Sequence, residues 1–269
     1  LFDKTPAWLK AVLYNLMFLF PVIIIIQQIV FRNIYSNIRW GWGLIPVIVI
    51  LMAYWFLTKR LSRFQKDRMI SHSLKITGNW LQIASLLIGL CLFTGGMVFL
   101  LAGLIPTEDF AQLQTILAFQ ALEPAMAIPL LLALALSAGF VEEITYRGFM
   151  QHATSSRYHK WLSFFIVGLL FSLAHRLPLA LFIPYLLVSM TYSVVADHQK
   201  SLGLVILAHV LIDFTIFILI YLSVIDLTAT KPGFSIISGL VVCIGAFLIL
   251  FAKKFNQNQK VQVFKEAVI

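Results

Sequence analysis

The chain has 269 residues, of which 61% are hydrophobic and only 12% are charged, and its mean hydropathy is +0.94. An ordinary soluble domain cannot bury this apolar share, so the composition excludes that class and predicts an integral membrane protein. The formal net charge is +9. Because the basic residues fall in short loops and tails, membrane topology and anionic lipid headgroups account for them, and nucleic-acid binding is not expected.

Apolar stretches of roughly 20 residues, the length that crosses a hydrocarbon core, follow one another along the chain. They predict an all-α, polytopic membrane protein with about eight transmembrane helices, near 8–31, 43–58, 79–104, 127–150, 161–175, 178–196, 202–224 and 234–252. The fifth and sixth stretches are short and alternatively form one broken helix. The weakly polar stretch 105–123 is expected to be a loop or a surface helix. Residues 1–269 are expected to form a single membrane domain.

The distribution of basic residues predicts the orientation, since lysine and arginine stay preferentially on the cytoplasmic side. The densest basic run is 59–68, between the second and third spans. We expect this run to be cytoplasmic. With eight spans, both termini are then also cytoplasmic.

Ionisable residues interrupt the later apolar stretches, where they are expensive and usually functional. They are Glu142, Glu143 and Arg147 in the fourth stretch, His175 at the end of the fifth, and His209 and Asp213 in the seventh.

The spacing of these residues predicts that they meet at one depth. Glu142 lies about 16 residues before the turn near Tyr158, and His175 lies about 17 residues after it. At about 1.5 Å of rise per residue, both lie about 25 Å along their helices from that turn. From the next inner loop, His209 and Asp213 lie about 13 and 20 Å along the seventh helix by the same rise. The four side chains are expected to converge in a polar cavity open to the cytoplasm.

Helical spacing also assigns different environments to the two acids. Glu143 and Arg147 are four residues apart, so they share a helix face and can form an ion pair that supports the site structurally. Glu142 points about 100° away and is the freer carboxylate. His209 and Asp213 are again four apart, so both can address the same small volume or each other.

A carboxylate that faces histidines in a partly dry cavity can deprotonate water for attack on an amide carbonyl. Two alternatives stay open at this point. The polar residues could only hold the helices together. Two histidines and a glutamate are also an acceptable catalytic zinc set, although the His-Glu-x-x-His arrangement of soluble zinc peptidases is absent.

In chain order, the sequence contains Glu-Glu-x-x-x-Arg at 142–147, Phe-x-x-x-His at 171–175 and His-x-x-x-Asp at 209–213. Over roughly residues 127–215 it resembles the intramembrane endopeptidases of the CAAX prenyl protease type II and bacteriocin-processing group, formerly called abortive-infection proteins. The resemblance implies a glutamate peptidase without a cofactor, although zinc stays a weaker alternative.

The resemblance also implies roles for individual residues. Glu142 would be the base that activates water, His175 would orient that water, and His209 would contribute to the same site. The residue at position 213 would stabilise the oxyanion, but an ionised Asp213 would repel it, and the eukaryotic enzymes of the group have asparagine there.

The resemblance implies a peptide or membrane-associated protein as substrate: a prenylated protein, a peptide pheromone or a bacteriocin precursor. The small size of the chain fits the bacterial members of the group better. Two alternatives from other classes are a non-proteolytic membrane immunity factor or scaffold, and a proton-coupled transporter. No polar path continues toward the outer face of the membrane, which disfavours the transporter.

Overall fold

The computed structural model describes scattered positions between 5 and 28 and the ranges 44–64, 74–102 without 77, 119–175, 179–224 and 236–252. Within these residues every element is helical and no strand element occurs. The helices are α3 (Leu44–Phe64), α4 (Trp80–Ala102), α6 (Pro124–Ser137), α7 (Gln151–Ser155), α8 (Lys160–Ala174), α9 (Leu179–Gln199) and α10 (Gly203–Tyr221). Two π-helical segments, η5 (Ala138–Glu142) and η6 (Ile144–Met150), lie between α6 and α7, the 3-10 turn η4 spans Phe119–Ala121, and a last apolar helix spans Ile236–Ala252.

The predicted all-α membrane architecture is confirmed. Three described helices are long and apolar enough to cross a membrane, and they span Trp80–Leu100, Pro124–Ser155 and Gly203–Tyr221. Further shorter apolar helices span Ile45–Phe56, Lys160–Ala174 and Ile236–Ala252. The fifth and sixth predicted spans are separate helices, α8 and α9, that pack against each other. Most of the first predicted span, and 105–118 of the weakly polar stretch, lie outside the described residues, so the count of eight stays a prediction.

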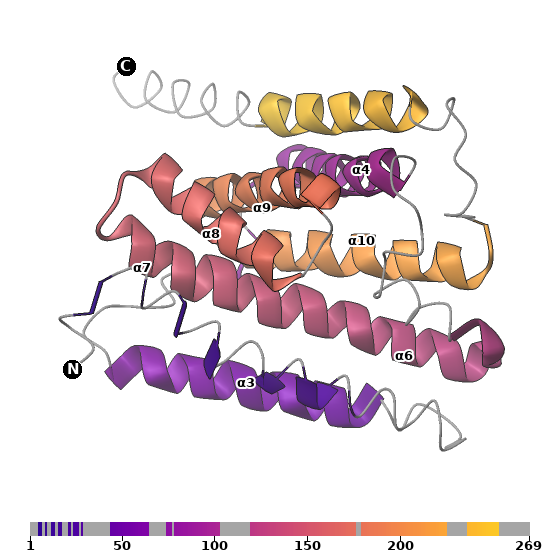
Figure 1. Ribbon diagram of the computed structural model, residues 1–269, viewed down its shortest axis with the longest axis horizontal. Helices are drawn as coiled ribbons and strands as arrows, with labels where there is room; N and C mark the ends of the chain where they lie inside the picture. The colour runs from indigo at the N-terminus through magenta and orange to yellow at the C-terminus, as the bar shows by residue number, and fades with distance from the viewer. Residues whose placement is uncertain are drawn as a thin grey trace.

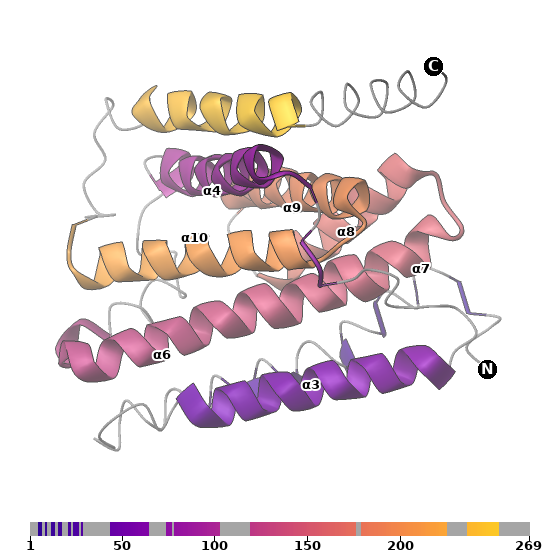
Figure 2. The same ribbon diagram turned by 180° about the vertical axis from the view of Figure 1, so that it is seen from behind.

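The helices lie side by side with α10 near the centre (Figures 1 and 2). Helix α10 packs against α4, α6 and η5, while α8 packs against α9 and α3 packs against α6. Helix Ile236–Ala252 lies on the far side of α4, opposite α3 (Figure 1). The polar motifs lie on elements that contact one another: η5 packs against α10 and continues into η6, which contacts α8.

Gly139 permits a close contact between η5 and α10. A Cβ atom at this position would lie 2.9 Å from the backbone nitrogen of Val210 and 3.1 Å from the carbonyl oxygen of Ile206. Membrane helices associate by such close packing of small residues, because lipid removes the hydrophobic drive that operates in water. The contact brings the backbone next to His209 against the turn that carries the two glutamates.

The long helix Pro124–Ser155 departs from regular α geometry where the glutamates lie. Two π-helical segments flank Glu143, and π turns occur frequently at functional sites. Just before the first, the hydroxyl of Ser137 donates to the carbonyl of Leu134 at 2.8 Å, a local bond that competes with the helical ladder. The hydroxyl of Tyr54 in α3 lies 2.6 Å from Thr145 Oγ1 and 3.5 Å from the carbonyl of Val141, so α3 supports this segment.

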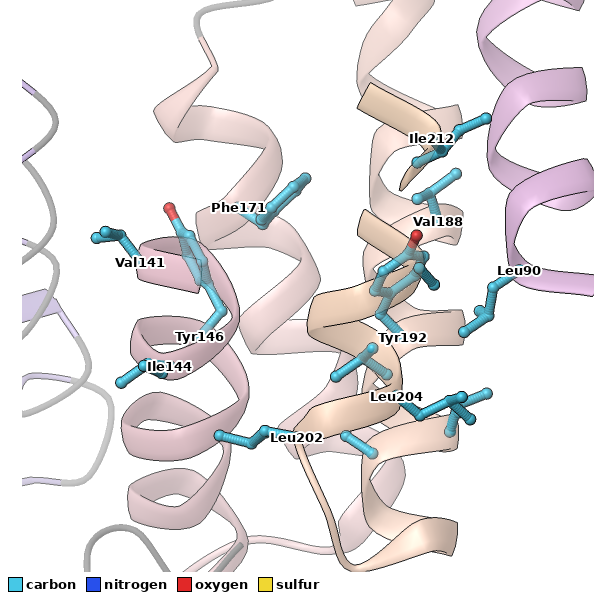
Figure 3. Close-up of a cluster of buried hydrophobic side chains, with 14 of the residues drawn as sticks. Leu90, Val141, Ile144, Tyr146, Phe171, Val188, Tyr192, Leu202, Leu204 and Ile212 are labelled. Atoms are coloured by element: carbon cyan, nitrogen blue, oxygen red, sulfur yellow. The ribbon is translucent and has the colours of Figure 1, made fainter. Parts of the chain in front are cut away.

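A cluster of buried apolar side chains lies between the inner helices (Figure 3). Tyr146 from η6 and Phe171 from α8 pack edge to face, with ring centroids 5.0 Å apart. Tyr192 from α9 belongs to the same cluster. These large rings fix the spacing of the helices around the polar residues.

The basic residues of three predicted inner loops gather at one end of the molecule. Lys160 at the start of α8 and Lys200 after α9 both pair with Asp197, the latter at 2.8 Å. Ser201 donates to the carbonyl of Lys75 at 2.7 Å. Partial burial alone would raise the pKa of Asp197, but the hydrogen bonds with the two lysines outweigh it and hold that pKa below its usual value. The cytoplasmic orientation of this end stays a prediction.

Replacement of Gly139 by alanine is expected to lower the thermal unfolding midpoint of the purified protein in detergent. The added Cβ meets backbone atoms of α10, which cannot move aside as a side chain can. Gly239→Ala is the matched control, because a Cβ there meets nothing within 4 Å and alanine favours a helix over glycine by about 1 kcal/mol. A midpoint for Gly139→Ala equal to or above that of the control would contradict the close contact.

Candidate active site

The six ionisable residues singled out by the sequence lie together, although four helical elements supply them. Glu142 ends η5, Glu143 and Arg147 follow on the same long helix, His175 caps the C-terminus of α8, and His209 and Asp213 lie on α10. The expected convergence of these side chains is therefore observed.

Glu143 and Arg147 form a buried ion pair at the centre of this group. Glu143 Oε1 accepts a hydrogen bond from Arg147 Nη1 at 2.9 Å and another from His209 Nδ1 at 2.7 Å. Arg147 Nη2 also donates to the carbonyl and to the hydroxyl of Ser189 in α9, each at 2.9 Å. Both charged side chains are at most 1% exposed. The pair thus connects the long helix to α9 and α10.

Aromatic rings surround the guanidinium group of Arg147. Its Cζ lies 5.1 Å from the ring centroid of Phe171, 5.4 Å from that of Tyr192 and 6.0 Å from that of Tyr146. Rings at this distance attract a cation through their negative faces. Because these rings replace water around the charge, the orientation of the guanidinium is fixed by packing as well as by hydrogen bonds.

Glu142 is the carboxylate that the ion pair leaves free. Its Oε2 lies 3.8 Å from His175 Nε2 and 4.0 Å from His209 Nε2, and it accepts no hydrogen bond from the described residues. Polar atoms at such separations are well placed to share a bridging water molecule. The side chain is 10% exposed, so its surroundings are mostly protein.

Backbone and carboxylate contacts fix the tautomers of the two histidines. His175 Nδ1 lies 2.8 Å from the carbonyl of Phe171, which can only accept, so Nδ1 carries the proton. In its neutral form, the His175 ring therefore presents an acceptor nitrogen to the space beside Glu142. His209 Nδ1 donates to Glu143, which directs its Nε2 toward Glu142 and Asp213.

Asp213 lies one turn along α10 from His209, with Oδ2 3.5 Å from the Nε2 atom of that ring. At 23% exposure it is the most open of the four residues nearest the free carboxylate. Its carboxylate can accept a proton or a hydrogen bond from His209, but in its ionised form it offers no donor.

A metal ion is the chemical alternative at these residues. Ligands of one tetrahedral zinc at about 2.0–2.1 Å lie about 3.4 Å apart. The separations of 3.8 and 4.0 Å between Glu142 and the two histidines are wider. Across the described part of the chain, no group of three His, Cys, Asp or Glu residues is arranged to hold a metal.

Sequence reasoning missed two residues of this region. Ser189 receives two hydrogen bonds from Arg147, and Tyr185 places its ring 5.2 Å from that of His175. Both lie in α9, which contains no charged residue near the site. A polar residue four positions from another polar residue, as in Ser189 and Ser193, is only a weak signal in an apolar helix.

The described helices and the site together define a membrane-embedded protein in which one carboxylate lies between two histidines. Residues 124–215 match the family described as type II CAAX prenyl endopeptidase Rce1-like. Over these residues the match confirms the resemblance predicted from the three motifs. No curated protein and no solved structure matches the chain at the threshold applied.

Glu143→Gln is expected to lower the free energy of unfolding by about 3–5 kcal/mol, because it leaves the buried Arg147 charge without an anion. Asp197→Asn is the surface control, since it removes a carboxylate that pairs with exposed lysines and is expected to cost less than about 1 kcal/mol. Thermal unfolding of both purified variants in one detergent measures the difference. If both variants lower the unfolding midpoint equally, the buried pair stabilises the fold no more than the surface pairs of Asp197 do.

Proposed function

We propose that the protein is an intramembrane endopeptidase in which Glu142 activates the attacking water. The observation that carries the proposal is the position of Glu142 Oε2, which is buried, accepts no hydrogen bond from the described residues and lies within 4.0 Å of both histidine Nε2 atoms. The family match supports proteolysis in the membrane, and the residue roles are our inference from the contacts.

The proposed reaction begins with a water molecule held between Glu142 and His175. Both atoms that face it are acceptors, so they bind its two protons and direct an oxygen lone pair away from them. Glu142 takes one proton as the water oxygen attacks the carbonyl carbon of the substrate. When the C–N bond breaks, the same carboxyl group returns this proton to the leaving amine.

The other polar residues position this machinery in the proposed mechanism. Glu143 fixes the ring of His209 through Nδ1, and Arg147 holds Glu143 in place. His209 Nε2 faces the same space as the free carboxylate. A low-dielectric environment strengthens each of these electrostatic interactions relative to water.

We propose as substrate a prenylated protein, a peptide pheromone, a bacteriocin precursor or another membrane-associated peptide that enters from the cytoplasmic leaflet. A protease of this family implies a peptide or membrane-associated substrate. The exposed side of the site at Asp213 would admit an extended segment.

The direct test measures cleavage of quenched fluorescent peptides by the purified protein in detergent, using a farnesylated CAAX peptide and its unprenylated counterpart. Glu142→Gln and His175→Ala are each expected to lower kcat by at least about 100-fold, as loss of a general base does. Activity of the unmodified protein is expected to survive a chelator.

Three outcomes separate the alternatives. Chelator-sensitive cleavage that zinc restores would show that a metal, not Glu142, activates the water. Full cleavage by Glu142→Gln would refute the assigned base. If no peptide is cleaved and both variants keep the cellular function of the unmodified protein, an immunity factor or scaffold replaces the proposed peptidase.

A further inference from the structure

One requirement of amide hydrolysis is not met by the residues nearest Glu142. Attack on the carbonyl group moves an electron pair onto oxygen, and enzymes stabilise this oxyanion with donors aimed at it. The neutral ring of His175 presents an acceptor, and an ionised Asp213 offers none. His209 Nε2 lies 3.5 Å from Asp213 Oδ2, so a proton on this nitrogen is directed to that carboxylate. A donor from another element would leave this contact intact.

Tyr185 in α9 is placed to supply that donor. Its ring lies 5.2 Å from the ring of His175 and stacks on Phe171 at 6.4 Å, with an interplanar angle of 27°. Its hydroxyl is within electrostatic range of the carboxylates of Asp213 and Glu142. Among the described residues no side chain or carbonyl takes a hydrogen bond from this hydroxyl, so it is available to a substrate.

The position of Tyr185 is set by the packing of two helices. A Cβ atom at Gly168 in α8 would lie 3.1 Å from the carbonyl oxygen of Leu186 in α9, so the helices touch beside Tyr185. The rings of Phe171 and His175, both from α8, then hold the phenol from one side. A donor held by packing needs no reorganisation as charge develops, which is what makes such groups effective.

Tyr192, the next tyrosine of α9, has a different environment. Its hydroxyl oxygen accepts a hydrogen bond from Thr94 Oγ1 in α4 at 3.5 Å, and its ring meets the ring of His209 edge to face at 5.7 Å. The hydroxyl therefore lies against α4, and the residue serves as a packing element. Each tyrosine lies beside one site histidine, and of the two hydroxyls that of Tyr185 has no hydrogen-bond partner among the described residues.

We propose that Tyr185 is a further catalytic residue whose hydroxyl donates a hydrogen bond to the oxyanion. The inference rests on the proposed peptidase function and adds a residue to it. As the water oxygen bonds to the carbonyl carbon, the π electron pair moves to the carbonyl oxygen and one water proton moves to Glu142. Tyr185 keeps its own proton throughout and only donates the hydrogen bond. Cleavage of the C–N bond restores the carbonyl and sends the proton of Glu142 to the amine.

The first experiment compares Tyr185→Phe with Tyr192→Phe in the peptide cleavage assay. Tyr185→Phe keeps the ring that packs on His175, so the thermal unfolding midpoint is expected to change little. Its kcat is expected to fall about 100-fold, the usual effect of one lost oxyanion donor, while KM changes by no more than a few-fold. Tyr192→Phe is expected to lower kcat by less than about threefold.

A second measurement replaces Tyr185 by a fluorinated tyrosine, which preserves packing but has a more acidic hydroxyl. If the protonated hydroxyl is the donor, the alkaline limb of the kcat–pH profile moves to lower pH. The same replacement at Tyr192 is expected to leave that limb in place. If fluorotyrosine at position 185 leaves the alkaline limb of the kcat–pH profile in place, the inference is overturned. This holds even if Tyr185→Phe has a low kcat, since altered packing could lower it.

Failure of this inference is distinguishable from failure of the proposed function. If Glu142→Gln is inactive while Tyr185→Phe keeps kcat within twofold of the unmodified protein, the peptidase stands and Tyr185 is not the donor. If Glu142→Gln is fully active, the proposed base is wrong and the role of Tyr185 falls with it.

Discussion

The buried ion pair between Glu143 and Arg147 is the interaction on which the arrangement of the inner helices depends. Two charges away from water are tolerated only when good geometry and further hydrogen bonds offset their desolvation. His209 supplies one such bond to the glutamate, and Ser189 supplies two acceptors to the arginine. Because these partners belong to α10 and α9, satisfying the pair also fixes where both helices lie.

The pair also explains how two adjacent glutamates differ so completely. Successive residues of a helix point in directions about 100° apart. Glu143 therefore faces Arg147 and supports the fold, while Glu142 faces the gap between the two histidines. His209 links the two acids, since one ring nitrogen bonds Glu143 and the other faces Glu142. The imidazole of His209 thus connects the Glu143–Arg147 ion pair to Glu142.

The sequence was sufficient to predict the helical membrane fold and the meeting of Glu142, His175 and His209, because apolar length and helical rise are regular quantities. It was insufficient for the π turns around Glu143, because apolar periodicity does not reveal where a helix departs from regular geometry or that this segment contacts α3 and α10. Tyr185 was missed for a similar reason. A tyrosine in an apolar helix is as ordinary in the core as in a site, and only the packing of α9 on α8 distinguishes the two.

Access to the site is graded along its polar residues. Side-chain exposure rises from 10% at Glu142 through 12% at His209 and 16% at His175 to 23% at Asp213. The free carboxylate is therefore the most enclosed of the four. In the proposed reaction, the peptide would approach past Asp213, whose ionised form would accept a hydrogen bond from a peptide N–H. The peptide carbonyl would then take its hydrogen bond from the phenol of Tyr185, which packs against His175.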